Sequence, residues 1–272
     1  MNLKSNVKHI FGIWNNVKSK ISKAEHILLL LDYDGTLTPI VRRPELARLP
    51  NRTRTLLKQL LRRKYVTVGI ISGRSLRDVK KLVGLKGTIY VGNHGLELEG
   101  PNFKFVNPAA KNSKPLIQKI GRKLKEKLRQ INGALVEPKG LTLSVHHRLV
   151  KGSDLIILKG IFDNVTKPFR IRKKIKVGMG KKVFEVRPPV KWDKGKIVKW
   201  ILARLYPGHK AKGLLPIYLG DDRTDEDAFR ALKRKGLTIF VGKKKAFSKA
   251  DYFVTSTEEV NSFLDRILKL KD

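Results

Sequence analysis

The feature that most constrains the fold is an apolar run that ends directly in a carboxylate. Ile27-Leu28-Leu29-Leu30-Leu31 is followed at once by Asp32. A strand that reads this way is buried on both faces, as the strands of parallel sheets are. Similar runs occur at 66–72 and 89–92, and helical patterns precede each of them at 51–64 and 74–83. This β-α-β-α-β alternation predicts an open α/β sheet with right-handed crossovers.

The pattern changes after about residue 95. The sequence there predicts a hairpin at 96–105, a long basic helix at 112–132, a helix near 153–164, and antiparallel strands at 135, 141–145 and 183–186. Alternating helices and strands return after Pro188-Pro189. We therefore expect a Rossmann-like α/β core with a parallel sheet and an inserted α+β cap domain. The expected domains are an N-terminal helical extension at 1–25, the core at 26–95 and 189–272, and the cap at 96–188.

The first 25 residues carry apolar side chains at helical spacing, at Ile10, Trp14, Val17 and Ile21, with lysines between them. This spacing predicts an amphipathic helix. We expect its apolar face to pack on the domain that follows. Docking onto a partner protein or a membrane surface is the alternative that this pattern leaves open.

The charge of the chain is unusual, with 60 Lys and Arg against 23 Asp and Glu and a formal net charge of +37. Such a surface attracts polyanions, acidic membranes or phosphorylated substrates. The basic residues are spread along the whole chain in short runs, which favours solvated faces over a nucleic-acid motif. The absence of cysteine excludes disulfides and thiolate chemistry. With no apolar run of membrane-spanning length and no signal peptide, we expect a cytoplasmic protein without a membrane partner.

The few acidic residues gather in two places, Asp32-Tyr33-Asp34-Gly35 and the segment 220–227. Each follows an apolar strand, so both are expected at the carboxyl edge of the sheet, where open α/β sheets bind ligands. Carboxylates crowded there repel one another unless a cation joins them. Mg²⁺, which prefers oxygen ligands, fits this site.

The spacing of the first cluster suggests its chemistry. Asp32 can face a phosphorus atom, and Asp34, two residues on, can reach the leaving oxygen. Gly35 lets the backbone approach the phosphate, and the N–H groups that follow can contact it. A carboxylate acts as a nucleophile when cations and dipoles neutralise the phosphoryl oxygens.

These motifs resemble those of haloacid-dehalogenase-type phosphatases. Asp-x-Asp-Gly-Thr-Leu after a hydrophobic strand is the signature of that family, and 70–74, 192–195 and 220–227 look like its other three motifs, in the right order. The resemblance implies Mg²⁺ as cofactor and a nucleophile, an acid–base and two phosphate-stabilising residues, here Asp32, Asp34, Ser72 and Lys194. It implies metal binding by Asp32, the Asp34 carbonyl and Asp221, with Asp222 and Asp225 orienting metal-bound water or Lys194.

Within that branch the sequence most resembles the trehalose-6-phosphate phosphatases, on segments 92–97, 136–140, 146–148, 185–188 and 220–229. The resemblance implies Mg²⁺-dependent hydrolysis of trehalose 6-phosphate through an aspartyl-phosphate, and association with a trehalose-phosphate synthase as a partner. The residues expected to contact the sugar phosphate are Gly35, Arg74, Asn93, His94, Glu137, Lys139, His146, Arg148, Glu185 and Arg187.

Three alternatives stay open at this point. Glu137–Lys139 and Glu185–Arg187 can be ion pairs on the cap surface, since residues two apart share one face of a strand. The substrate can be another sugar phosphate, such as sucrose phosphate or mannosyl-phosphoglycerate. The charge also leaves room for a nucleic-acid-binding protein built on this fold, although such a protein has no use for crowded carboxylates.

Overall fold

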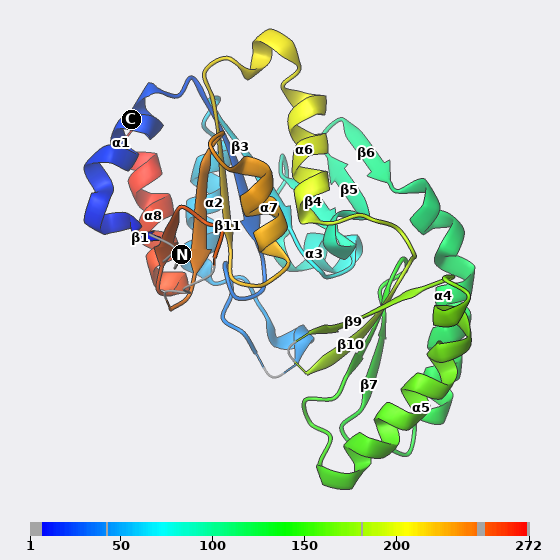
Figure 1. Cartoon of the computed structure of the whole chain (residues 1–272). Helices are drawn as coiled ribbons and strands as arrows, with labels where there is room; N and C mark the ends of the chain where they lie inside the picture. The colour runs from blue at the N-terminus through cyan, green and yellow to red at the C-terminus, as the bar shows by residue number, and fades with distance from the viewer. Residues whose placement is uncertain (1–6, 42, 181, 244–247, 271–272) are drawn as a thin grey trace, which may run out of the picture. The chain divides into compact units, whose positions relative to one another are not determined.

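The computed structural model describes residues 7–41, 43–180, 182–243 and 248–270. The chain forms two compact units, one made of Met1–Lys104 with Trp192–Asp272 and the other of Phe105–Lys191 (Figure 1). The second unit is thus an insertion in the first. The functional boundaries of the core and cap that we expected at 95/96 and 188/189 stay a prediction.

The first unit is built on a sheet of nine strands among the described residues, in the order β1-β13-β12-β11-β2-β3-β4-β5-β6. All neighbours from β1 to β4 pair in parallel, and β5 pairs antiparallel with β4. The predicted α/β core with a parallel sheet is therefore confirmed. The strands are β1 Lys8–His9, β2 His26–Asp32, β3 Val66–Ile71, β4 Ile89–Gly92, β5 Glu97–Gly100, β6 Phe103–Val106, β11 Leu214–Gly220, β12 Leu237–Val241 and β13 Tyr252–Val254.

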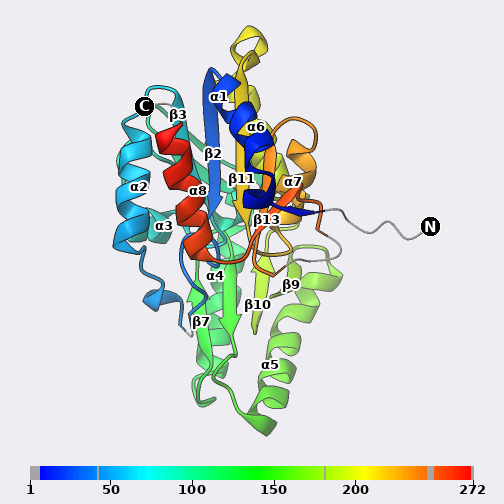
Figure 2. The same ribbon diagram turned by 90° about the vertical axis from the view of Figure 1, so that its left-hand side faces the viewer.

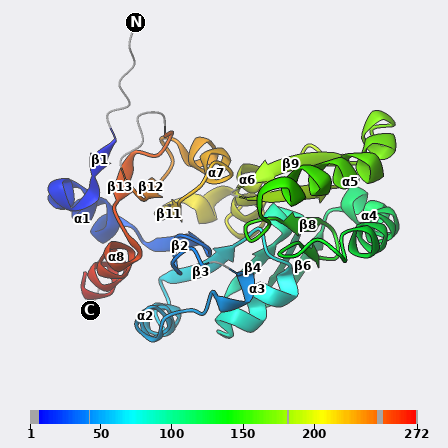
Figure 3. The same cartoon turned by 90° about the horizontal axis from the view of Figure 1, so that it is seen from below.

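Helices cover both faces of this sheet, which explains why β2 is apolar at almost every position. Figures 2 and 3 show α1, α2, α3 and α8 on one face and α6 and α7 on the other. The two sides of β2 are buried alike, with Leu29 and Leu30 both fully inaccessible. The helices are α1 Trp14–Lys23, α2 Asn51–Leu61, α3 Leu76–Val83, α6 Lys194–Leu205, α7 Asp225–Leu232 and α8 Thr257–Lys269, with 3₁₀ turns η1 Ile10–Ile13, η2 Pro44–Leu46, η3 Asn93–Gly95 and η4 Gly208–Ala211.

The strand order places a switch point beside β2. From β2 the chain moves to β3 and β4 on one side and later returns to β11 on the other. In open α/β sheets a crevice for ligands forms at such a point, outside the carboxyl ends of the strands. Strand β2 ends at Asp32 and strand β11 ends at Gly220, and the two acidic clusters begin at these residues.

Local sequence signals fix where two helices near the site begin. Ser75 accepts a hydrogen bond from the Asp78 amide and caps α3, and Asp193 accepts one from the Lys196 amide and caps α6. Both are residue types that favour this position, because the side-chain oxygen satisfies an amide that the helix leaves without a partner. Capping by Asp193 makes Lys194 the first residue of α6.

The N-terminal segment is partly helical. Residues 14–23 form α1 as predicted, but Lys8–His9 form strand β1, which pairs with β13 at the sheet edge. Ile10, Val17 and Ile21 are buried in the core of the first unit. The apolar face of α1 is therefore packed against its own domain and is not exposed for docking a partner. The first six residues of this predicted helix lie outside the described residues.

The second unit is a four-stranded antiparallel sheet in the order β7-β8-β10-β9, with two helices on one of its faces. Side chains of both helices form one core with Leu143, Val145, Phe184 and Val186 of the sheet. The sequence missed β9, and it placed the second helix at 153–164, whereas this helix continues to residue 171. The elements are α4 Pro108–Lys127, β7 Leu135–Pro138, β8 Leu143–His146, α5 Gly152–Ile171, β9 Lys176–Gly180 and β10 Val183–Arg187.

A search of the described residues finds no helix with the length and apolarity needed to cross a membrane.

Candidate active site

The carboxyl edge of the sheet brings three of the four motifs together. Strand pairing aligns Leu31 with Leu219 and Asp32 with Ile71. Asp32 therefore lies between the end of β11, followed by Asp221, and the end of β3, followed by Ser72. Parallel strands end at one edge of a sheet, so this neighbourhood follows from the topology alone.

Lys194 brings the remaining motif to the same place. Its Nζ lies 2.6 Å from Asp32 Oδ1 and 2.7 Å from Asp225 Oδ1. The Lys194 and Asp225 side chains are at most 2% exposed. The Tyr218 hydroxyl also donates a hydrogen bond to Asp225 Oδ1, at 2.7 Å. A buried cation thus joins two buried carboxylates.

The protonation of this cluster follows from burial and charge. Burial disfavours the charged form of Lys194, but Asp225 and Asp32 outweigh it and hold the pKa of Lys194 well above its ordinary value. Burial raises the pKa of Asp32 well above its usual range; Lys194 lowers it, and Asp225, Asp221 and Asp222 raise it further. One lysine therefore does not neutralise the carboxylates around Asp32, and a second cation would stabilise their charged forms.

The acidic cluster has the donor set that such a cation needs. Asp32, Asp221 and Asp225 each offer an oxygen, and these oxygens lie within 4.8 Å of one another. Carboxylate oxygens suit a hard divalent ion such as Mg²⁺. Both oxygens of Asp225 already accept hydrogen bonds, from Lys194 and Tyr218 on Oδ1 and from the Asp222 amide on Oδ2. This leaves Asp225 better suited to positioning Lys194 than to binding metal.

Asp222 is held by the loop after β11. Its Oδ1 accepts hydrogen bonds from the Thr224 amide and the Thr224 hydroxyl, both at 2.7 Å. Burial acts against its charge, but Lys194 and the Thr224 donors prevail and hold the pKa of Asp222 below its usual range. Asp222 is therefore a fixed negative charge beside the cluster.

Gly35 provides space between the two acidic segments. Its φ is +90°, and a Cβ there would lie 2.3 Å from Asp221 Oδ2. Its amide donates to the Thr38 carbonyl, at 2.8 Å, so this amide is used within the turn itself. Only glycine adopts this positive φ without strain and also leaves room for the Asp221 carboxylate.

Changing Gly35 to alanine is therefore expected to displace Asp221 and to lower the free energy of unfolding by about 1–3 kcal/mol. Thermal unfolding of the variant measures this. Gly12→Ala is the matched control, because a Cβ on Gly12 meets nothing within 4 Å. Equal melting temperatures for the two variants would show that the close approach of Gly35 and Asp221 has no energetic role.

Arg74 contacts Asp34. Its Nε lies 2.7 Å from Asp34 Oδ2, and a terminal nitrogen lies 2.6 Å from Oδ1. The guanidinium also lies over the Tyr33 ring, 5.5 Å from its centroid. A guanidinium that donates to both carboxylate oxygens fixes the orientation of the carboxylate. Arg74, expected to contact substrate, thus holds the proposed acid–base residue in this structure.

Ser72, Asn93 and His94 belong to two loops that interlock. The Ser72 hydroxyl oxygen accepts from the Arg74 amide at 3.1 Å, and the Ser72 carbonyl accepts from the His94 amide at 3.0 Å. Asn93 and His94 both have positive φ, at +49° and +56°. Glu97 Oε1 accepts from the Asn93 side chain and from the Leu76 amide, at 2.6 and 2.8 Å. This backbone conformation is costly, and Glu97 helps to hold it.

The predicted sugar-contacting residues of the second unit lie mostly on one face of its sheet. Strand register aligns Glu137, Ser144 and Glu185 across β7, β8 and β10, and His146 follows on the same face. The helices pack on the other face. Glu137 Oε2 lies 2.7 Å from His146 Nε2 and 3.7 Å from Lys139 Nζ.

Arg187 and Arg148 are the remaining predicted sugar-contacting residues of the second unit. Arg187 donates from Nε to Glu185 Oε2 at 2.9 Å. Both ion pairs that the sequence left open as an alternative are therefore present, and a polar face of paired charges is also what a sugar needs. Arg148 lies beyond the end of β8 and is exposed. These side chains and the Asp32 cluster belong to different compact units.

Sequence reasoning missed two residues of the first unit that organise the site. Tyr218 lies on β11, three residues before Asp221. It belongs to an apolar strand, so the sequence gives no sign that its hydroxyl contacts Asp225. Glu97 is the last residue of segment 92–97, which carries the family resemblance, but the sequence predicts no role for it. Both act through contacts with distant or turn residues, which spacing alone does not reveal.

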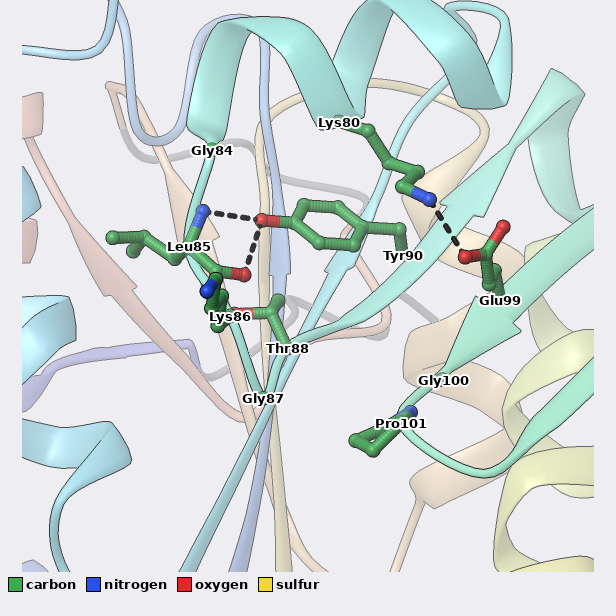
Figure 4. Close-up of a pocket in the computed structure, with 10 residues that line it drawn as sticks. All are labelled: Lys80, Gly84, Leu85, Lys86, Gly87, Thr88, Tyr90, Glu99, Gly100 and Pro101. Atoms are coloured by element: carbon green, nitrogen blue, oxygen red, sulfur yellow. Dashed lines mark hydrogen bonds and ion pairs between the residues drawn. The ribbon is translucent and has the colours of Figure 1, made fainter.

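A pocket of about 420 Å³ in the first unit lies away from these residues (Figure 4). It is at the start of β4, whereas Asn93 follows the end of that strand. The Tyr90 hydroxyl accepts from the Leu85 amide and donates to the Leu85 carbonyl, and Lys80 pairs with Glu99 at 2.7 Å. It contains none of the predicted site residues.

Comparisons with known proteins point to one family. Residues 30–258 match the trehalose-phosphatase family. The chain is 37% identical over 266 residues to probable trehalose-phosphate phosphatase D of Arabidopsis thaliana, covering 93% of this chain and 70% of that protein. The C-terminal domain of C. albicans trehalose-6-phosphate phosphatase has a similar structure, with a TM-score of 0.78 and 25% identity, covering 94% of this chain and 96% of that one. A haloacid dehalogenase-like hydrolase from Bacteroides thetaiotaomicron shares the fold, with a TM-score of 0.60 and 15% identity over 89% of this chain and 99% of that one.

Proposed function

Because this chain belongs to the trehalose-phosphatase family, we propose that it hydrolyses trehalose 6-phosphate to trehalose and inorganic phosphate, with Mg²⁺ as cofactor. The observation that carries the proposal is the buried cluster in which Lys194 joins Asp32 and Asp225. It supports a phosphoryl-transfer centre because it places a carboxylate beside fixed positive charge, where phosphoryl oxygens can be stabilised.

In the first step, an Asp32 carboxylate oxygen attacks phosphorus and forms an aspartyl-phosphate. The bond from phosphorus to the sugar oxygen breaks, and Asp34 gives its proton to that oxygen. In the second step, Asp34 takes a proton from water as the water oxygen attacks phosphorus. The bond to Asp32 breaks, inorganic phosphate leaves, and both carboxylates regain their starting state.

The other residues position and stabilise. Lys194 and the Ser72 hydroxyl neutralise developing charge on the phosphoryl oxygens. Arg74 must release at least one Asp34 oxygen before that oxygen can reach the sugar. Asp32, Asp221 and the Asp34 carbonyl would hold Mg²⁺, which would supply further charge neutralisation when bound.

The proposed function is tested by phosphate release from a panel of sugar phosphates, with and without Mg²⁺. We expect preference for trehalose 6-phosphate over glucose 6-phosphate, sucrose phosphate and mannosyl-phosphoglycerate, and loss of turnover when the metal is chelated. A different preferred sugar would keep the roles of Asp32 and Asp34 and overturn the proposed sugar contacts in the second unit. No release from any substrate would overturn the proposal itself.

Asp34→Asn tests the acid–base assignment through the leaving group. Turnover of trehalose 6-phosphate is expected to fall by about 10²–10⁴-fold, because a sugar alkoxide needs a proton to leave. Hydrolysis of p-nitrophenyl phosphate is expected to fall much less in its first step, since nitrophenolate leaves unaided. Single-turnover rates with the two substrates separate these effects. An equal loss with both would assign Asp34 a role other than proton donation.

Metal binding is tested without turnover. Thermal unfolding of the parent is expected to shift upward by several degrees on addition of Mg²⁺, since a ligand that binds only the folded state stabilises it. Asp221→Asn removes one of the clustered carboxylates and is expected to lose most of this shift. Asp265→Asn, far along the chain in α8 and paired with Lys269, is the control that keeps it. A full shift in the Asp221 variant would exclude Asp221 as a ligand.

The structure adds nothing to the expected association with a trehalose-phosphate synthase, which stays a prediction. One structural neighbour is the C-terminal domain of a Candida albicans trehalose synthase regulatory protein, at 14% identity, and this likeness shows the fold alone.

A further inference from the structure

Positive charge concentrates in the second unit. Phe105–Lys191 is roughly a third of the chain and holds 22 of the 60 Lys and Arg but only 5 of the 23 Asp and Glu. Two of those five acids, Glu137 and Glu185, are paired on the polar face of the sheet. The other three, Glu126, Asp154 and Asp163, lie on α4 and α5, where ten Lys and Arg outnumber them.

The most exposed apolar side chains lie in the same unit. The most exposed of the large apolar side chains in the described residues are Met179, Ile156 and Ile171, at 84%, 74% and 69%, and Ile157 is 53% exposed. Three of these four belong to α5. Met179 is on β9, where it pairs with Phe184 and therefore points to the helix-bearing face of the sheet.

The isoleucines of α5 form one stripe. At about 100° per residue, Ile156, Ile157 and Ile171 fall within a sector of roughly 100° and span about 22 Å of helix. The opposite side of α5 buries Leu158 and Phe162 in the core of the unit. The stripe thus points outward, and Figures 1 and 3 show α5 at the outside of this unit.

Cations border this stripe. Lys159, Lys167 and Arg170 are exposed on the same side of α5. Two acids lie on α5 beside these cations, Asp154 in its first turn and Asp163, whose carboxylate lies 3.6 Å from Arg170. A row of exposed isoleucines flanked by cations is the pattern of a helix that lies in a lipid headgroup region.

We propose that α5, with Met179 at the sheet edge, binds the surface of an anionic lipid membrane. The isoleucines enter the boundary of the acyl chains, and the cations contact the lipid phosphates. This peripheral contact differs from a membrane span and revises our expectation of no membrane partner.

Two other occupants fit the observations less well. A second copy of the chain would bring two basic surfaces together, which like-charge repulsion opposes. Single-stranded nucleic acid is usually held by exposed aromatic side chains. The exposed large apolar residues of this unit, within the described part of the chain, include none.

The test is sedimentation of the whole chain with vesicles. We expect binding to vesicles of equal parts phosphatidylcholine and phosphatidylglycerol, weak binding to phosphatidylcholine alone, and loss with rising salt. The triple variant Ile156→Ser, Ile157→Ser, Ile171→Ser is expected to bind at least about tenfold more weakly. It should keep the parent's melting temperature, since all three side chains are exposed. Ile40→Ser, at an isoleucine 53% exposed in the first unit, is the matched control and should bind like the parent.

Three outcomes would overturn the proposal. The first is unchanged vesicle binding by the triple variant, which would assign any attraction to charge alone. The second is equal binding to neutral and anionic vesicles. The third is a parent that is oligomeric in solution when the triple variant is monomeric, which would make the stripe a contact between copies.

Discussion

Asp32→Asn is expected to reduce turnover of trehalose 6-phosphate to below about a thousandth of the parent rate. An amide oxygen is a poor nucleophile, and no neighbouring group replaces the carboxylate that Lys194 positions 2.6 Å away. Steady-state phosphate release measures this loss. Activity above that limit would remove Asp32 from the nucleophile's role.

The same variant is not expected to unfold. Asp32 is buried beside Asp221 and Asp225, and burial and these neighbours raise its pKa. Removing one negative charge relieves repulsion in the cluster, although it weakens the contact with Lys194. Thermal unfolding should therefore show a small change, and Asp265→Asn should leave both activity and stability at the parent level. A collapse of stability would make the lost turnover uninformative about chemistry.

Lys194→Ala is expected to have the largest effect on stability. It leaves Asp32 and Asp225 buried without their cation, and breaking a buried pair in this way costs about 3–5 kcal/mol. Turnover should be lost as well, because Lys194 stabilises the phosphoryl oxygens. Chemical unfolding and phosphate release measure the two effects separately.

Lys199→Ala is the matched control, since Lys199 is exposed on the same helix α6. It should change the free energy of unfolding by less than about 0.5 kcal/mol. Equal stability of the two variants would show that the contacts of Lys194 do not hold the cluster together. Should Lys194→Ala fail to fold, Lys194→Met, which keeps the volume, allows the loss of turnover to be measured.

Much of the first unit was predictable because its signals are local. The apolar run before Asp32 predicts a strand buried on both faces, and β2 is such a strand. The motif at 192–195 is also local, since its Asp193 caps α6 and makes Lys194 the first residue of that helix. Residues at the ends of parallel strands meet at one edge, so the order of the motifs was enough to place Asp32 near Asp221.

Contacts between distant residues were not predictable in the same way. The pairing of Arg74 with Asp34 joins residues forty positions apart, and nothing in either motif separates it from a contact with substrate. Strands β1 and β13 are two and three residues long, so neither shows a period. They form because β13 pairs with β12 and β1 pairs with β13. The stripe on α5 was not predicted, because the exposure of Ile156 and Ile157 depends on which face of α5 packs on the sheet of the second unit.

The location of the phosphoryl group during turnover is the most direct test of Asp32 as the nucleophile. The parent is mixed with trehalose 6-phosphate and Mg²⁺, quenched in acid within one turnover, and digested for mass spectrometry. We expect a phosphoryl group on the peptide that contains Asp32, and none on that peptide in Asp32→Asn. A phosphoryl group on another residue, or turnover in which no quench time yields a phosphorylated peptide, would contradict this assignment.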